Sequence, residues 1–354
     1  MRGVLSLPHA MTDSCPLPSP PSSEVIQLAH GGGGRATWRL LHDHVLPALG
    51  LTGPSTDAAA LAPPPGARLA YTTDASVVRP LEFPGGDIGR LAVFGTVNDL
   101  AAAGARPLAL SLSLILEEGL AIAVLRRVLA SIAGAAAVAG VRVVTGDTKV
   151  VERGKADGVY TVVSGIGVVA PGGDVGPHRI RPGDVVIATG DVGRHGVAIL
   201  SVREGLGFEG VTSDCAPVTG LLDALLAADV ELHCLRDPTR GGVSAVLHEL
   251  ALDAGVAISI HEPAIPIDPA VAAACELLGL DPLAMACEGR LVVVVPPDHV
   301  DRAIAALRAC PEGARAAAIG AVEPAPAGRV VATTALGTRR VLDFSAGEQL
   351  PRIC

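Results

Sequence analysis

Several aspartates lie beside small or polar residues, at what we expect to be loops or the ends of elements: Asp74, Asp87, Asp99 and Asp147. Separate carboxylates that converge on one point suit Mg²⁺ bound to a triphosphate, because this ion prefers oxygen ligands and keeps several waters. Taken alone, each of these aspartates is more often a cap or a turn residue. Asp237, in the run DPTRGG, has the same ambiguity, since Asp followed by Pro is also a good helix start.

The two lysines of the chain, Lys149 and Lys155, lie in one segment between residues 146 and 158, whereas arginine is used everywhere else. An ammonium differs from a guanidinium because its pKa can be lowered until it gives up its proton. Lys149 is therefore a candidate for contacting phosphate or for handling a proton. Chance in an arginine-rich sequence is the alternative.

A run of glycines, Gly31–Gly34, is followed by Arg35. Glycines let the backbone approach an anion closely and point N–H groups at phosphate oxygens, and Arg35 adds positive charge. The run is not a Walker A loop, because no Gly-Lys-Ser/Thr follows, and a flexible linker is the alternative. A second string, at residues 205–210, formally matches GxGxxG, but it follows an expected helix where the dinucleotide motif needs a strand.

The sequence ends in Cys354, within a stretch of ten residues that shows no periodicity. A cysteine in an aperiodic tail is expected to be exposed and free to move, whereas a structural cysteine is usually buried within an element. Pro351 favours an extended backbone at Leu350 and helps to present the tail. Ten residues span at most about 35 Å, enough to cross the face of a domain. An incidental tail is the alternative.

The composition excludes several classes of function. A formal net charge of -9 without a basic block argues against a nucleic-acid partner, and 2% aromatic residues leave no set of stacking platforms for single strands. Seven cysteines without a CxxC pair predict reduced thiols and a cytoplasmic location. We expect no membrane partner, because the sequence shows neither a signal peptide nor an uninterrupted apolar span.

The elements that must position these residues form an alternating pattern of strands and helices from Leu69 onward. Leucines with period two between residues 108 and 116 predict a strand, residues 122–139 a helix, and residues 141–145 a second strand. The second strand would leave Gly146–Lys149 in a loop beyond its carboxyl end, where ligands of α/β sheets usually bind.

A stretch rich in glycine and proline, at residues 171–182, predicts a boundary between two domains. Beyond it we predict a strand at 184–189, a helix at 243–254 and a strand at 291–295. We therefore divide the chain into a disordered extension at 1–23, an N-terminal ATP-binding and dimerisation domain at 24–176, a C-terminal α+β domain at 177–344 and a flexible tail at 345–354.

Together these features resemble the HypE family, the carbamoyl dehydratases of hydrogenase maturation, within the aminoimidazole ribonucleotide synthetase-like superfamily. The resemblance runs from about Ile26 to Cys354. It is carried by LAHGGGGR at 28–35, TTDA at 72–75, PGGDIGRLAVFGTVNDLAAAGA at 84–105, TGDTKVVERGKADG at 145–158, GDVGRHGVAIL at 190–200, SDCAPV at 213–218, HCLRDPTRGG at 233–242, CEGRL at 287–291 and GEQLPRIC at 347–354. The glycine and aspartate segments are shared across the superfamily, whereas the PRIC ending is specific to HypE.

This resemblance implies an α/β plus α+β fold of two domains, whose N-terminal domain dimerises through a β-barrel, with ATP and Mg²⁺ in a cleft at the dimer interface. The implied metal and phosphate ligands are Asp74, Asp99, Asp147 and Asp237. The implied nucleotide contacts are Gly31, Gly32, Gly33, Gly34, Arg35, Asp87, Asn98, Thr148, Gly241 and Gly242. Lys149 and Glu288 would lie near the nitrogen of the substrate, and Cys287 replaces an Asn that is usual in the family.

The implied activity is the ATP-dependent dehydration of a carbamoyl group on Cys354 to a thiocyanate, which supplies cyanide for the iron of NiFe hydrogenase. The carbamoyl oxygen is a poor leaving group, so it must first be phosphorylated, and Glu288, or Lys149 if neutral, would accept protons from nitrogen. The implied partners are a HypF-type carbamoyltransferase and a HypC–HypD-type complex. A small-molecule enzyme such as selenophosphate or aminoimidazole ribonucleotide synthetase, and a non-catalytic maturation scaffold, are the alternatives.

Overall fold

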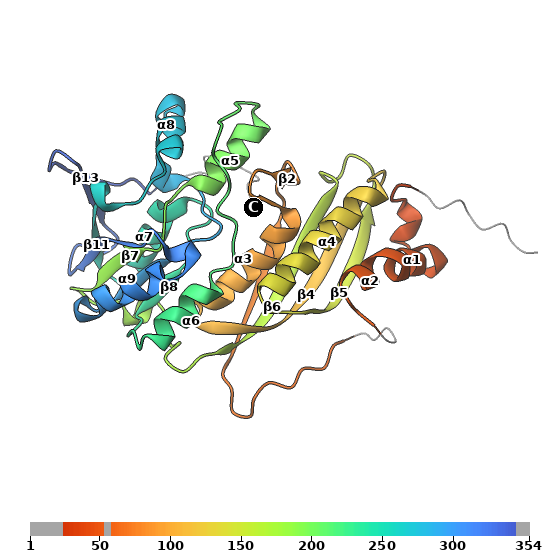
Figure 1. Ribbon diagram of the computed structural model, residues 1–354, viewed down its shortest axis with the longest axis horizontal. Coiled ribbons are helices and arrows are strands. Elements are labelled where there is room, and N and C mark those ends of the chain that lie inside the picture. Colours follow the sequence, from red (N-terminus) through yellow and green to blue (C-terminus); the bar gives the residue numbers. More distant parts are fainter. Residues whose placement is uncertain (1–23, 53–57, 345–354) are drawn as a thin grey trace, which may run out of the picture.

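The structure, a computed structural model, describes residues 24–52 and 58–344. The predicted extension at 1–23 and the segment 345–354 with Cys354 lie outside the described residues. Two parts lie side by side along the long axis of the molecule, one around a four-stranded sheet and one around a seven-stranded sheet (Figure 1). The domain boundary expected at residue 176 stays a prediction.

The N-terminal sheet has the strand order β1-β6-β4-β5, and β4 and β5 are its parallel pair. The helices α3 and α4 cover one face of this sheet (Figure 1). The elements are β1 (Leu69–Ser76), α3 (Ile88–Ala102), β4 (Ala105–Glu117), α4 (Ile122–Val138), β5 (Val143–Val151) and β6 (Val159–Val169). The strand and the helix predicted near residues 108–116 and 122–139 are thus confirmed.

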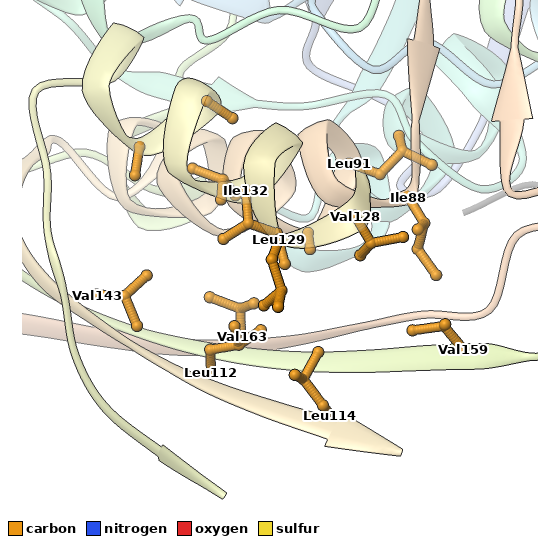
Figure 2. Packing of buried hydrophobic residues seen from close by; sticks show 14 of the residues in the cluster. Ile88, Leu91, Leu112, Leu114, Val128, Leu129, Ile132, Val143, Val159 and Val163 are labelled. Atoms are coloured by element: carbon orange, nitrogen blue, oxygen red, sulfur yellow. The ribbon is translucent and has the colours of Figure 1, made fainter. Parts of the chain in front are cut away.

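The alternation along β4 explains this layering. Leu112 and Leu114 point toward the helices and pack near Val128 and Leu129 of α4 (Figure 2). Because successive residues of a strand point to opposite faces, every second residue is directed to the other side of the sheet. On that side Tyr71 of β1 is 69% exposed, so an apolar side chain faces away from the core.

The prediction that Gly146–Lys149 form a loop is wrong, because β5 continues through them to Val151. Asp147 and Lys149 pair with residues of β4, and both side chains are exposed. An edge strand with one solvent-exposed side can carry charged residues at every second position, so these charges do not end the strand.

Short helices and a hairpin complete the N-terminal part. They are η1 (Leu28–His30), α1 (Gly34–Leu40), η2 (Leu41–Val45), α2 (Leu46–Ala48), β2 (Glu82–Phe83) and β3 (Gly86–Asp87). η1 lies against β5, and α2 lies against α4. Leu40 and Val45 are buried and join the core below α4.

The C-terminal sheet has the order β13-β12-β9-β11-β7-β10-β8. Its strands are β7 (Val185–Ala188), β8 (Cys234–Arg236), β9 (Ala257–His261), β10 (Val292–Val295), β11 (Ala317–Glu323), β12 (Val330–Thr333) and β13 (Arg339–Val341). The helices are α5 (Arg194–Arg203), α6 (Thr219–Ala227), α7 (Gly242–Asp253), α8 (Pro269–Leu278) and α9 (Val300–Arg308), with 3-10 turns η3 (Pro177–Arg179), η4 (Glu262–Ala264), η5 (Pro282–Ala284), η6 (Pro297–His299) and η7 (Pro311–Gly313).

Helices cover both faces of this sheet. Along β10, Val292 and Val294 join the cluster below α7, whereas Val293 and Val295 join the cluster below α6 and α9. A strand that is buried on both sides reads as a continuous apolar run, as predicted for residues 291–295. No helix in the described part of the chain is long and apolar enough to cross a membrane.

Candidate active site

A cavity of about 640 Å³ lies between the two parts of the molecule. Its walls come from β1 and α3 on one side and from the segments around β8 and α7 on the other. Four carboxylates that the sequence analysis singled out line it together with Glu249 of α7, and we call it the acidic cavity after these four: Asp74, Asp99, Asp237 and Glu288. Residues more than two hundred positions apart in the sequence thus meet at one place.

Asp74 and Asp99 come from neighbouring elements of the N-terminal part. A Cβ atom at Gly95, one turn before Asp99 on α3, would lie 2.5 Å from Oδ2 of Asp74, so this glycine leaves room for the carboxylate of Asp74 in its present position. Oδ2 of Asp99 accepts a hydrogen bond of 2.7 Å from the hydroxyl of Thr72. Burial raises the pKa of both carboxyls.

Asp237 follows directly after β8. The helix start proposed as its alternative role lies elsewhere, because α7 begins at Gly242 and Gly241 is its N-cap residue. Burial, followed by the charge of Asp99, raises the pKa of Asp237 to about 7. Asp237 therefore does not cap a helix.

Glu288 is 4% exposed and lies in the loop between η5 and β10. Within the part of the chain that the structure describes, its Oε1 atom has no hydrogen-bond partner. Burial, and then the charge of Asp74, raises its pKa well above the ordinary value. An unpaired buried carboxyl is costly, so its presence in a cavity indicates a chemical role.

Asp214 contacts the backbone of Glu288. The sequence analysis did not single out this residue. Its Oδ1 accepts a hydrogen bond of 3.1 Å from the backbone N–H of Glu288, and its side chain is fully buried. Arg290 lies 3.8 Å away and partly balances the charge. The run SDCAPV contains this residue, but nothing in its spacing relates it to Glu288, which is 74 positions away.

The residues of the acidic cavity fit a divalent cation that is shared with phosphate. Their raised pKa values come from burial and, for three of them, also from one another's charge, and a cation would relieve both. Within residues 24–52 and 58–344, no three His, Cys, Asp or Glu side chains converge as a complete metal site. Such an incomplete set suits Mg²⁺, which takes few protein ligands and keeps oxygen ligands from phosphate and water.

Asp147, the fourth predicted metal ligand, lies away from this cavity. Asp74 and Asp147 stand on the two opposite edge strands, so three strand spacings, about 14 Å, separate them. Through the strand register Asp74 is aligned with Gly146, the residue before Asp147, so the two side chains also point to opposite faces of the sheet. A single copy of the chain cannot place both carboxylates on one ion.

Lys149 lies beside Asp147 and not beside Glu288. Its Nζ is 2.8 Å from Oδ2 of Asp147, and this hydrogen bond lowers the pKa of that aspartate. Both side chains are more than half exposed, so the pair adds little to stability. The two predicted proton-handling residues therefore lie at different places in one copy of the chain.

The glycine run lies next to the same edge strand. A Cβ at Gly31 would be 2.8 Å from the backbone nitrogen of Val150 on β5, so this glycine permits a close approach. Gly33 and Gly34 adopt positive φ angles of 83° and 71°, which glycine tolerates best. Gly32 lies between Gly31 and Gly33, and Arg35 is exposed in the first turn of α1.

Thr148 and Asp147 line a second cavity, of about 650 Å³, between the helices around residues 37–51 and the strands β4 and β5. Its other walls are largely apolar and include Leu41, Leu46 and Leu49. Thr148 thus belongs to a cavity separate from the acidic cavity, and the glycine run contacts the same edge strand β5 through Gly31.

Two further predicted contacts have structural partners. Asp87 is the N-cap of α3, where Oδ1 accepts hydrogen bonds from the N–H groups of Gly89 and Arg90. Asn98, 2% exposed, links the two parts, since its Nδ2 donates to the carbonyl oxygen of Glu288 at 3.2 Å. Nucleotide contacts by these residues stay predictions.

Gly241 and Gly242 start α7 at the rim of the acidic cavity. Both have positive φ angles, 77° and 61°, and a Cβ at Gly242 would lie 2.5 Å from two backbone oxygens. Two arginines also line the cavity, Arg236 and Arg240, and the sequence analysis did not assign them. Their position on either side of Asp237 was the available signal.

The unusual Cys287 is buried, and its sulfur accepts a hydrogen bond of 3.2 Å from the backbone N–H of Gly193. Burial raises the pKa of its thiol well above the ordinary value, so this cysteine is a packed thiol and not a reactive one. Cys354 lies outside the described residues.

Comparisons with known proteins agree with this architecture. Residues 55–169 match the family model described as AIR synthase related protein, N-terminal domain, and residues 181–333 match the corresponding C-terminal domain. The chain is 51% identical over 336 residues to the carbamoyl dehydratase HypE of Rhodobacter capsulatus, covering 94% of this chain and 98% of the relative. The corresponding Escherichia coli protein is 43% identical over 93% of this chain and 99% of its own.

A solved structure of hydrogenase maturation protein HypE in complex with ATP superimposes with a TM-score of 0.86 and 44% sequence identity, covering 92% of this chain and 99% of that one. The two sheets and the cavity between them are therefore those of an AIR-synthase-related two-domain protein. Within that class, the chain belongs to the HypE family of carbamoyl dehydratases, the hydrogenase maturation proteins.

Proposed function

We propose that the protein uses ATP to convert a carbamoyl group on the sulfur of Cys354 into a thiocyanate for hydrogenase maturation. The observation that carries this proposal is the acidic cavity, with the unpaired carboxyl of Glu288 beside three aspartates. The family membership supports the activity, and the ATP complex of a relative supports the nucleotide.

The chemistry requires two steps. The carbamoyl oxygen takes the terminal phosphoryl group of ATP, which turns a poor leaving group into phosphate, and ADP is released. Loss of that phosphate, with transfer of the nitrogen protons to bases, leaves S–C≡N on the cysteine. Asp74, Asp99 and Asp237 would hold Mg²⁺, which would neutralise charge on the phosphates.

Glu288 is the residue best suited to accept a nitrogen proton. A carboxyl with a raised pKa is a stronger base once ionised, and proton transfer is most efficient when the pKa of the base lies near the working pH. Its burial keeps water away from the intermediate. Lys149 can contribute only if a second copy of the chain brings it to the cavity.

A homodimer would bring the two regions together. Asp147 and Lys149 face the side of the N-terminal sheet on which Tyr71 is exposed, so pairing of two sheets there would bury apolar surface and join each acidic cavity to the partner's Asp147. A β-barrel formed from the two sheets is the arrangement that we propose. The glycine run and Thr148 would then contact the same nucleotide.

We further propose that a HypF-type carbamoyltransferase loads Cys354 and that a HypC–HypD-type complex receives the cyanide. A relative of 44% identity and TM-score 0.75 was solved as a HypE–HypF complex, covering 78% of this chain and 90% of that one, which supports the first partner. The five cysteines in the described residues are free, which fits a cytoplasmic location.

Mass spectrometry of the C-terminal peptide tests the proposal. The enzyme is carbamoylated on Cys354, mixed with Mg²⁺ and ATP, and digested. We expect the peptide to lose the mass of one water while ATP is consumed. Cys354→Ala should bind ATP and form no product, whereas the control Cys310→Ala, at a half-buried cysteine of the C-terminal part, should react normally. A loaded enzyme that consumes no ATP would instead indicate a non-catalytic scaffold.

A further inference from the structure

His248, a buried histidine on α7, has no part in the chemistry described above. Its Nδ1 lies 2.8 Å from the carbonyl oxygen of Ser244, one turn earlier on the same helix. Its Nε2 lies 3.1 Å from the carbonyl oxygen of Leu342, and its ring is stacked on Phe344 with centroids 5.0 Å apart and planes at 10°. We call these contacts of His248 with Leu342 and Phe344 the anchor.

The anchor joins the end of the described chain to the wall of the acidic cavity. α7 starts at the rim of that cavity, and Val246, Glu249 and Leu250 of this helix line it. His248 belongs to the same two turns of α7. The segment at residues 342–344 is therefore attached to a helix that lines the cavity.

Phe344 gains little from ordinary core packing, because it remains 51% exposed although it is a large apolar residue. Leu342, in contrast, is buried, and its N–H donates a hydrogen bond of 3.0 Å to the carbonyl oxygen of Val330. The N–H of Leu342 is thus bonded independently of His248, whereas its carbonyl oxygen faces Nε2 of His248. Stacking of Phe344 on the imidazole ring adds an attachment two residues further along.

This attachment sets the start of the segment that carries the reactive sulfur. Cys354 follows Phe344 by ten positions in the sequence, and ten residues of chain span at most about 35 Å. Without the anchor, the segment that leads to Cys354 would be held only as far as Leu342. The direction of the chain at residues 343 and 344 would then no longer be fixed. A longer and less directed tether lowers the effective concentration of a group at its end.

We propose that His248 is a positioning residue, which holds the base of the C-terminal segment against α7 and thereby raises the rate at which the carbamoylated Cys354 reacts in the acidic cavity. This inference rests on the proposed function. A neutral imidazole always carries one N–H, and both facing carbonyl oxygens are acceptors, so the ring can donate to one of them in every protonation state.

Single-turnover dehydration on the full chain tests this role. Cys354 is carbamoylated chemically with cyanate, so that no partner protein is needed, and Mg²⁺ and ATP are added in excess. The first-order conversion to thiocyanate is followed from the mass of the C-terminal peptide. We expect His248→Ala and Phe344→Ala each to lower this rate about three- to tenfold, the loss that corresponds to one ordinary hydrogen bond or stacked pair. His261→Ala, at an exposed histidine at the end of β9, is the control.

Two readouts separate positioning from a merely structural role. The ATP concentration at half-maximal rate should stay unchanged, because the anchor does not touch the nucleotide. The double variant should lose no more rate than His248→Ala alone, because the stacked pair that Phe344→Ala removes is already lost in that variant. His248→Phe, which keeps a stacked ring, should recover part of the rate.

The outcomes are distinct. If the wild-type enzyme forms no thiocyanate, the proposed function is wrong and this inference falls with it. If the wild-type enzyme reacts and both single variants react as fast or faster, the function stands and the anchor has no positioning role. Rate losses that are accompanied by equal losses in ATP affinity, or that add up in the double variant, would also overturn the inference. Phe344 is half exposed, so its variant is expected to fold.

Discussion

We expect Asp237→Asn to stabilise the enzyme without metal and nucleotide at neutral pH and, at the same time, to abolish its turnover. The pKa of Asp237 is raised from 3.8 to about 7 by burial and by Asp99. A rise of about three units corresponds to about 4 kcal/mol, which is the free energy that the native state loses when this carboxyl is ionised. Asparagine has nearly the same size and carries no charge.

The pH dependence of this effect follows from proton linkage. Between about pH 4 and about pH 7 the native state keeps a proton that the unfolded state has released, so the stability of the wild-type enzyme falls as the pH rises. The stabilisation by Asp237→Asn should therefore grow from about 1 to 2 kcal/mol at about pH 5 to about 4 kcal/mol at about pH 8.

Urea unfolding followed by circular dichroism measures these differences, without Mg²⁺ and nucleotide. Asp43→Asn, at an exposed aspartate of η2, is the matched control and should change the stability by less than about 0.5 kcal/mol at either pH. Equal effects of Asp237→Asn at both pH values, or a destabilisation at the higher one, would refute the reasoning. In that case the ionised Asp237 would not destabilise the native state in the absence of a cation.

Three further outcomes are expected. Asp74→Asn and Asp147→Asn should each be inactive, but an equimolar mixture of the two should regain about a quarter of the wild-type dehydration rate, because half of the dimers are mixed and each mixed dimer has one intact site; a mixture without activity would contradict a shared site. Gly242→Ala should lower the free energy of unfolding in urea by more than about 2 kcal/mol. Gly255→Ala, at a similar positive φ with open space around it, should lower it by about 1 kcal/mol. Equal losses of stability would contradict the close contact at Gly242. Asn98→Ala should lower the free energy of unfolding by about 2 to 4 kcal/mol, because backbone groups of the C-terminal part lose their hydrogen-bond partner. An unchanged denaturation midpoint would show that this side chain does not hold the two parts together.

Much of the fold was predictable because local patterns agree with it. The leucines of β4 alternate along a half-buried strand, and the apolar run around β10 is buried on both sides. The aspartates were predicted to share one place, and Asp74, Asp99 and Asp237 do line one cavity. Asp147 does not, because its position depends on the strand order, and no residue pattern states which strands are the two edges of a sheet.

The remaining differences also have physical reasons. Asp87 caps α3, because a carboxylate just before a helix satisfies free backbone N–H groups, and its predicted contact with nucleotide stays a prediction. Asp214 and the anchor residue His248 act through the backbones of Glu288 and Leu342. Contacts between a side chain and a distant backbone leave no periodic trace in a sequence, so they could be found only in three dimensions.

The placement of Asp74 and Asp147 on opposite edges and opposite faces of one sheet has a consequence for the cell. If two copies must meet before Asp74 of one and Asp147 of the other share a site, the output of the enzyme depends on how much of it is made. At low expression the subunits would separate, and the specific activity would fall steeply on dilution and recover on concentration. A cell could therefore silence this step simply by making fewer copies, without inhibitor or modification.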